Sequence, residues 1–134
     1  MENKSSDIHA HIEKQAYKTQ LSNHRHEILA DEPVENGGAD LGFSPSDLLC
    51  ASLAACTSIT LRMYADRKEI ALEAIDVDIW FEEDKEQGIT KLHRKIELKG
   101  NISDEQKTRF LQIADKCHIH KVLTHPIQIT SELA

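Results

Sequence analysis

Two cysteines of this 134-residue chain combine a reactive side chain with a position among apolar residues. Cys56 lies in the middle of a long apolar stretch, residues 44–68, and Cys117 follows 61 residues later at the end of a second apolar-periodic segment. A thiol can act as a nucleophile, ligate a metal ion, or pack as a small hydrophobic side chain. Packing is the commonest of the three, because free cysteine is among the most buried residue types. Spacing alone does not bring the two thiols together.

The third cysteine, Cys50, is expected to be structural. It precedes Cys56 by six positions, which corresponds to about 240° around a helix of 3.6 residues per turn. The two side chains therefore cannot share a helix face, and Cys50 is predicted to pack in the core.

The stretch around Cys56 predicts a long core helix. Ser44 can cap it, Pro45 suits its first position, and Asp47 complements its positive end. Positions 48–56 are almost all apolar or small, so this part should be buried on every side. One face is formed by Leu49, Leu53, Cys56, Thr60 and Met63. The apolar part is far shorter than the roughly 20 residues that span a bilayer, so we expect no membrane segment.

The flanking segments predict an α+β fold with a mostly antiparallel sheet around that helix, in a single domain over residues 1–134. Alternating apolar residues predict one hairpin from residue 8 to residue 31, with a bulge near Lys14 and its second strand over 25–31. A second hairpin is expected over 75–99, turning near Gly88. Ser103 and Gln106 are typical of a helix start, and this helix should end near Cys117. A helical turn over 118–123 and a closing strand at 127–129 complete the prediction.

Composition narrows the function classes. The formal net charge is -7, and no basic stripe is present, which argues against nucleic-acid binding. The first fourteen residues lack the apolar core of a signal peptide, so a cytoplasmic location is expected. Three cysteines are few, and an odd number cannot all pair within one chain, which argues against a structural disulfide framework.

The segment FSPSDLLCASLAACTSITLRMYADRK, followed about sixty residues later by CHIHKVL, resembles the two signature segments of the OsmC/Ohr family of peroxide-reducing proteins. The order of elements is similar as well, so the likeness covers nearly the whole chain. His118 stands where the family usually has proline, and the tail HKVL is closer to the OsmC-like branch than to the organic hydroperoxide resistance branch. The resemblance implies an OsmC-like fold in an intertwined homodimer, with the long helices central.

The resemblance also implies a two-cysteine peroxidase of oxidative stress defence. Cys56 would attack a hydroperoxide and become a sulfenic acid, and Cys117 would resolve it as a disulfide. An external dithiol, of lipoyl type in the family, would reopen the bridge. No cofactor is expected. The apolar surroundings of Cys56 favour organic hydroperoxides, although hydrogen peroxide is a further candidate.

Relatives activate the peroxidatic thiol with an arginine from the N-terminal hairpin, paired with a glutamate near the start of the long helix. Here Ser46 occupies the glutamate position and Asp47 is next to it. Arg25 is the only arginine before residue 62. Arg25 and Asp47 are therefore the candidates for the activating cation and its partner, and the alternative is that they are ordinary surface and capping residues.

Two other functions fit parts of the sequence. His9 with His11, and His24 with His26, would share strand faces, and Cys117, His118 and His120 add ligand types for a metal such as zinc. No compact metal motif such as CxxC or HExxH accompanies them. A non-catalytic module that binds an acyl or other apolar ligand near Cys56 is the other alternative. Unreactive thiols and a co-purified ligand or metal ion would favour these functions over the peroxidase.

Overall fold

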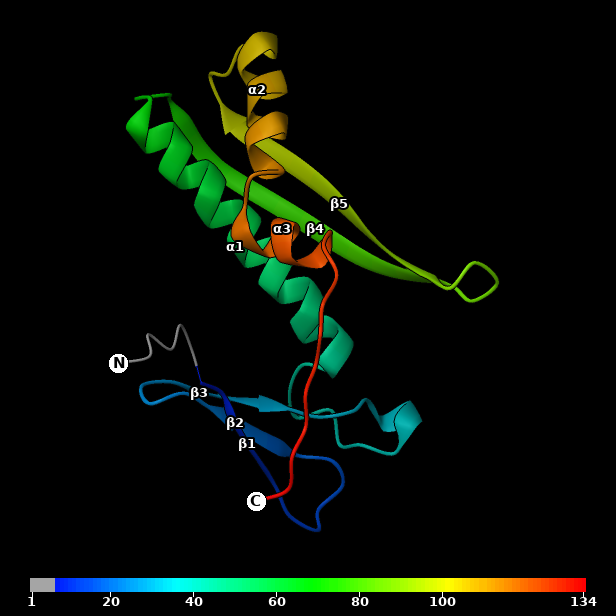
Figure 1. The fold of residues 1–134 in the computed structure, drawn as a ribbon. Helices are drawn as coiled ribbons and strands as arrows, with labels where there is room; N and C mark the ends of the chain where they lie inside the picture. Colours follow the sequence, from blue (N-terminus) through cyan, green and yellow to red (C-terminus); the bar gives the residue numbers. More distant parts are fainter. Residues whose placement is uncertain (1–6) are drawn as a thin grey trace. The chain divides into compact units, whose positions relative to one another are not determined.

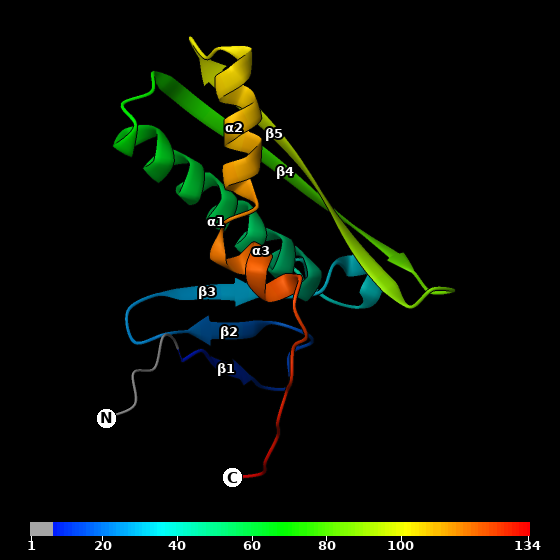
Figure 2. The ribbon, with the colours of Figure 1, turned by 45° about the horizontal axis from the view of Figure 1, so that its top comes forward.

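The computed structural model describes residues 7–134, and the chain divides into two compact units, residues 1–49 and residues 50–134. The first unit contains a three-stranded antiparallel sheet of β1 (His9–Ile12), β2 (Thr19–Ser22) and β3 (Glu27–Ala30), with the strands side by side in chain order (Figure 2). The predicted two-stranded hairpin is wrong in one respect. The loss of alternation near Lys14 is a loop between β1 and β2 and not a bulge within one strand.

The loop that follows β3 is organised by Asp31. This residue is 3% exposed, and its carboxylate accepts hydrogen bonds from the backbone N–H groups of Tyr17, Glu32, Ala39 and Leu41. The same loop contains the short 3-10 helix η1 (Val34–Asn36). A buried carboxylate needs hydrogen-bond donors, so the four backbone N–H groups that surround Asp31 fix a segment that has little regular structure of its own.

The long helix α1 (Pro45–Arg67) confirms the predicted start. Ser44 and Asp47 cap it reciprocally: the Asp47 N–H donates to the Ser44 hydroxyl, and the Ser44 N–H donates to the Asp47 carboxylate. The buried residues lie on one face and are Leu53, Thr57, Leu61, Tyr64 and Ala65. Burial of positions 48–56 on every side is not observed within one chain, because Leu53 is the one buried residue among them and Leu49 is 37% exposed.

In the second unit, α1 and α2 (Asp104–Ala114) pack against a long antiparallel hairpin of β4 (Leu72–Asp84) and β5 (Ile89–Gly100). Figure 2 shows α2 crossing over this hairpin and α1 running alongside it. The core cluster comprises Leu61, Tyr64, Ala65, Leu72, Phe110, Ile113 and Ala114. By length and composition α1 could cross a membrane, but its buried face belongs to this core, which makes it the core helix of the fold.

The end of the chain differs from the prediction at two places. The capping box of Ser103 and Gln106 begins α2 as expected, but α2 ends at Ala114, and Cys117 is the N-cap of a separate six-residue helix, α3 (His118–Leu123). The alternation at Ile127 and Ile129 forms no strand, and residues 124–134 extend away from α3 without regular structure (Figure 1). Alternation predicts a strand only where a partner strand is available to complete the hydrogen bonds.

Candidate active site

The site is built where the start of α3 lies against the middle of α1. Cys56 is half-buried on α1, Cys117 is 1% exposed at the start of α3, and both are free thiols. The Cys117 thiol is a hydrogen-bond partner of the Cys56 sulfur. The fold thus brings together two thiols that are 61 positions apart in the sequence.

Hydrogen bonds favour the thiolate form of Cys56. Burial raises the pKa of this thiol, but donors around the sulfur outweigh burial and hold the pKa below that of an ordinary thiol. The donors are the Ile119 N–H at 3.4 Å, the Cys117 thiol, the His118 N–H and the Thr60 hydroxyl. The backbone donors belong to the first turn of α3, where N–H groups have no partner within the helix. They are therefore free to stabilise the sulfur anion.

The environment of Cys117 has the opposite effect. Burial raises its pKa, and the neighbouring Cys56 sulfur raises it further through its charge and its hydrogen bond. The His120 N–H, 3.3 Å from the sulfur, and the Thr57 hydroxyl lower the pKa without reversing the shift. The pair therefore has a preferred arrangement in which Cys56 is the anion and Cys117 keeps its proton.

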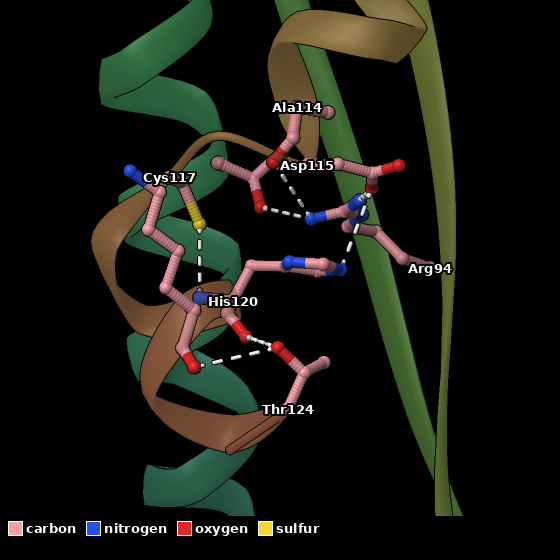
Figure 3. A network of polar contacts seen from close by, with 8 residues as sticks. Arg94, Ala114, Asp115, Cys117, His120 and Thr124 are labelled. Atoms are coloured by element: carbon pink, nitrogen blue, oxygen red, sulfur yellow. Dashed lines mark hydrogen bonds and ion pairs between the residues drawn. The ribbon is translucent and has the colours of Figure 1, made fainter.

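A polar network surrounds Cys117 (Figure 3). Arg94 of β5 has only 11% of its side chain exposed, and its guanidinium donates to the Thr57 hydroxyl at 3.1 Å, the Ala114 carbonyl at 3.3 Å and the Asp115 carboxylate at 2.6 Å. The His120 ring lies 3.5 Å from the same Asp115 oxygen. The network ties α1, the end of α2 and the start of α3 to β5.

The two predicted activating residues lie in the first unit. Arg25 is in the turn before β3 and not in a strand, and Asn23 accepts a hydrogen bond from its backbone N–H. Asp47 caps α1. The capping role, which was the alternative interpretation for Asp47, is the one that the structure displays.

Sequence reasoning missed three groups near the thiols: Thr57, Arg94 and the Ile119 N–H. Arg94 could have been identified from the sequence, because it alternates in phase with Leu92 and Ile96 and therefore lies on the buried side of its strand. A charged residue on an apolar strand face is expected to have partners. The Ile119 donor could not have been identified in this way, since a backbone N–H is present at almost every position.

Metal binding finds no support in the part of the chain that is described. Within residues 7–134, no group of three or more His, Cys, Asp and Glu side chains is arranged to hold a metal ion. His11 instead pairs with the Glu13 carboxylate at 2.8 Å, and His24 and His26 lie in the turn between β2 and β3.

Comparison with known proteins decides the family. A family model described as OsmC-like protein matches residues 37–132, which is more than half of the chain. The chain belongs to the OsmC-like protein family. A search of curated protein sequences found no significant match.

Solved structures share the OsmC-like fold over nearly the whole chain. An OsmC-like protein from Mycoplasma pneumoniae is 22% identical with a TM-score of 0.76, covering 91% of this chain and 89% of that one. A Psychrobacter arcticus protein whose name refers to osmotic stress and detoxification is 24% identical with a TM-score of 0.75, covering 94% and 91%. An organic hydroperoxide resistance protein from Legionella pneumophila is 19% identical with a TM-score of 0.64, covering 92% of each chain. At these identities the likeness establishes the fold.

Proposed function

We propose that this protein reduces hydroperoxides with Cys56 as the peroxidatic thiol and Cys117 as the resolving thiol. The observation that carries the proposal is the hydrogen-bonded pair of free thiols whose pKa values are shifted in opposite directions. A peroxidatic cysteine must be a thiolate to attack, and a resolving cysteine must be within reach of the product. The name of the Legionella pneumophila protein, an organic hydroperoxide resistance protein, supports the same chemistry.

The reaction proceeds in two steps. The Cys56 thiolate attacks the terminal, hydrogen-bearing oxygen of the hydroperoxide. The O–O bond breaks, Cys56 becomes a sulfenic acid, and the alkoxide that leaves takes up a proton. The Cys117 sulfur then displaces the hydroxyl group as water, which forms the Cys56–Cys117 disulfide. Organic hydroperoxides are favoured because apolar residues dominate the middle of α1 around Cys56. An external dithiol returns the enzyme to its reduced form.

Activation of Cys56 rests on the hydrogen-bond donors around its sulfur. The family arrangement of an arginine with a glutamate is altered here, where Ser46 replaces the glutamate. Arg25 remains our candidate for a cation that assists in the transition state, with Asp47 as its partner. The groups that lower the pKa of Cys56 are hydrogen-bond donors from α1 and the start of α3, and neither Arg25 nor Asp47 is among them.

Assembly and location complete the proposal. The exposed apolar side of α1, with Ile59 and Met63, would be covered by a second copy in an intertwined homodimer. The tail HKVL supports assignment to the OsmC-like branch of the family, and the free thiols are compatible with the proposed cytoplasmic location.

Mass spectrometry after one equivalent of cumene hydroperoxide tests the proposal. In a Cys50→Ser background, the otherwise native protein should lose two thiols and form the Cys56–Cys117 disulfide. Cys117→Ser should stop at a sulfenic acid on Cys56, which dimedone traps. Cys56→Ser should leave Cys117 reduced. Oxidation of Cys117 in Cys56→Ser as fast as in the parent contradicts the assigned roles.

A further inference from the structure

The Thr57 hydroxyl is the group between the reactive thiols and the buried Arg94. Thr57 is 0% exposed and directly follows Cys56 on α1, and its hydroxyl is one of the hydrogen-bond partners that lower the pKa of Cys117. The same hydroxyl oxygen accepts a hydrogen bond from the Arg94 guanidinium at 3.1 Å. A hydroxyl has one proton to donate, so an oxygen that accepts from Arg94 is oriented to donate toward Cys117.

The two sulfurs differ in their access to an incoming reductant. Cys117 is 1% exposed, whereas Cys56 is half-buried. Thiol–disulfide exchange requires direct contact between the attacking thiolate and one sulfur of the disulfide. The exposures therefore direct the attack to Cys56, which makes Cys117 the leaving group.

We propose that Thr57, oriented by Arg94, stabilises the Cys117 thiolate as the leaving group when a dithiol reduces the Cys56–Cys117 disulfide. The inference rests on the proposed function for the origin of that disulfide. Thr57 is a catalytic residue in this step because it touches the departing sulfur, and Arg94 is a positioning residue that acts through Thr57. The His120 N–H, 3.3 Å from the same sulfur, is a second donor.

Reduction of the Cys56–Cys117 disulfide takes two thiol–disulfide exchange steps. One thiolate of the external dithiol attacks the Cys56 sulfur, the Cys56–Cys117 bond breaks, and its electron pair leaves with Cys117. The second thiolate of the reductant then attacks the reductant's own sulfur in the mixed disulfide, which closes the reductant's disulfide and releases the Cys56 thiolate. The reductant loses two electrons, the protein gains two, and Cys117 takes up a proton.

A change in the charge of Cys56 during this cycle favours the departure of Cys117. In the reduced protein the Cys56 thiolate raises the pKa of Cys117. In the mixed disulfide Cys56 carries no charge, so that repulsion is absent at the moment when Cys117 leaves. The donors from Thr57 and His120 then act without the opposing charge.

Buried Arg94 has a further consequence for the design of variants. In Thr57→Val, which keeps the shape of the side chain, the guanidinium retains the Ala114 carbonyl and the Asp115 carboxylate as acceptors. The substitution therefore removes the hydroxyl without leaving the charge unpaired. Thr57→Ser restores a hydroxyl, and Ser58→Ala removes a neighbouring hydroxyl that bonds to the Ala54 carbonyl. Ser58→Ala is the matched control.

The test uses the full chain in a Cys50→Ser background, oxidised with diamide so that the disulfide does not depend on peroxidase activity. Reduction by dithiothreitol is followed by quenched alkylation. We expect Thr57→Val to slow reduction about tenfold, as for the loss of one hydrogen bond to a developing charge. Thr57→Ser, which restores a hydroxyl, should recover most of the rate that Thr57→Val loses, and Ser58→Ala should reduce at the parent rate. Arg94→Gln should slow reduction as well, and Arg94→Lys should recover part of the loss, with each fold verified by circular dichroism.

The direction of attack has its own readout. 2-Mercaptoethanol with a rapid acid quench should place the adduct on Cys56 and leave Cys117 free, as seen in peptide mass spectra. An adduct mainly on Cys117, a Thr57→Val rate equal to the parent rate, or failure of diamide to form the Cys56–Cys117 disulfide overturns the inference. If the variants change the rate of disulfide reduction as expected but cumene hydroperoxide does not oxidise the thiols, the proposed peroxidase function is excluded. The inference on Thr57 in the exchange step is then still supported.

Discussion

At the scale of the residue, the two thiols differ because their hydrogen-bond donors differ. The Cys56 sulfur accepts hydrogen bonds from the Ile119 N–H and the Cys117 thiol. These and other donors lower its pKa, and their effect is larger than the opposing effect of burial. Cys117 is more deeply buried and lies beside the Cys56 charge, so its pKa is raised. Two chemically identical side chains thereby acquire pKa values that are shifted in opposite directions, as the proposed roles require.

The pH dependence of alkylation follows from these directions. The rate for Cys56 should rise with pH and reach half of its maximum below pH 9.0, the ordinary thiol value, because the anion is the reactive form. Cys117 should reach half of its maximum at a higher pH than Cys56. Iodoacetamide labelling with peptide mass spectrometry measures both. A Cys56 midpoint above that of Cys117 would contradict the described hydrogen bonding.

Thr60 offers a specific check on the donors to Cys56. Its hydroxyl is one of the groups that lower the pKa of Cys56. Thr60→Val should move the midpoint of Cys56 alkylation to higher pH, because one hydrogen bond to the thiolate is lost. Ser58→Ala, two positions away on the same helix, is the control and should leave the midpoint where it is. Equal midpoints in Thr60→Val and Ser58→Ala would exclude the Thr60 contribution.

The stability of the protein should respond to the same shift. A thiol with a lowered pKa in the folded state stabilises the fold above the pKa of the unfolded thiol. That stabilisation is lost as the pH falls through the lower, folded pKa. In the parent, the free energy of unfolding in urea should therefore rise with pH between the folded and the unfolded pKa of Cys56. Cys56→Ser should reduce this slope, whereas the control Cys50→Ser should keep it. The same slope in both variants would count against a lowered pKa.

At the scale of the element, backbone geometry at the end of β5 limits the sequence. Gly100 has a φ of +141°, and a Cβ there would lie 2.4 Å from the Ala71 carbonyl oxygen. Gly88 has a φ of +66° in the β4–β5 turn, and nothing lies within 4 Å of a Cβ built there. Both positions disfavour a side chain by conformation, but only Gly100 adds a clash with backbone.

Gly100→Ala should therefore destabilise the protein more than Gly88→Ala. We expect about 1–2 kcal/mol for Gly88→Ala from the left-handed conformation, and clearly more for Gly100→Ala. Chemical denaturation of the two variants beside the parent measures the difference. Equal losses would mean that β5 shifts to accommodate the methyl group.

Sequence periodicity predicted the elements with regular, buried faces. The α1 helix and the β4–β5 hairpin were predicted in this way, because a 3.6- or 2-residue period over ten or more positions admits few alternatives. The start of α2 was predicted from the capping signal of Ser103 and Gln106. Periodicity did not predict β1 and β2 as separate strands. Each has only four residues, and two such short alternating segments on either side of a loop are also compatible with one bulged strand. The predicted strand at Ile127 and Ile129 is not observed. A strand forms only where a partner strand accepts and donates its backbone hydrogen bonds, and the local sequence does not show whether that partner is present.

The candidate site was predictable only in part. Resemblance to the family singled out Cys56 and Cys117, and the apolar periodicity placed Cys56 on a core helix. Cys117 was expected on the face of the preceding helix, whereas it caps the next one. That difference places the first backbone donors of α3 at the sulfur atoms, a consequence of three-dimensional packing that residue types do not encode.

At the scale of the whole molecule, α1 presents apolar surface that one chain does not cover. Ile59 and Met63 lie one turn apart, and more than half of each side chain is exposed. Exposed apolar faces of this kind mark association sites. We therefore expect sedimentation velocity to show a dimer at micromolar concentration, and a monomer at all concentrations would contradict the homodimer.

Charge substitution on this face should weaken the dimer. Met63→Lys places a charge on the exposed apolar side without entering the core, so the dissociation constant should rise at least tenfold while the circular dichroism spectrum is retained. Lys107→Glu on α2, an exposed and already polar position, is the control and should leave the dimer intact. Equal effects of the two substitutions would exclude this face from the interface.

The order in which the polypeptide is synthesised gives the start of α3 another significance. Cys56 emerges from the ribosome long before residues 117–119, which provide its resolving partner and its backbone donors. Until those residues are translated and folded, Cys56 has the reactivity of an ordinary thiol. The donors that lower the pKa of Cys56 are therefore in place only once the later part of the chain, with Cys117, has folded against α1.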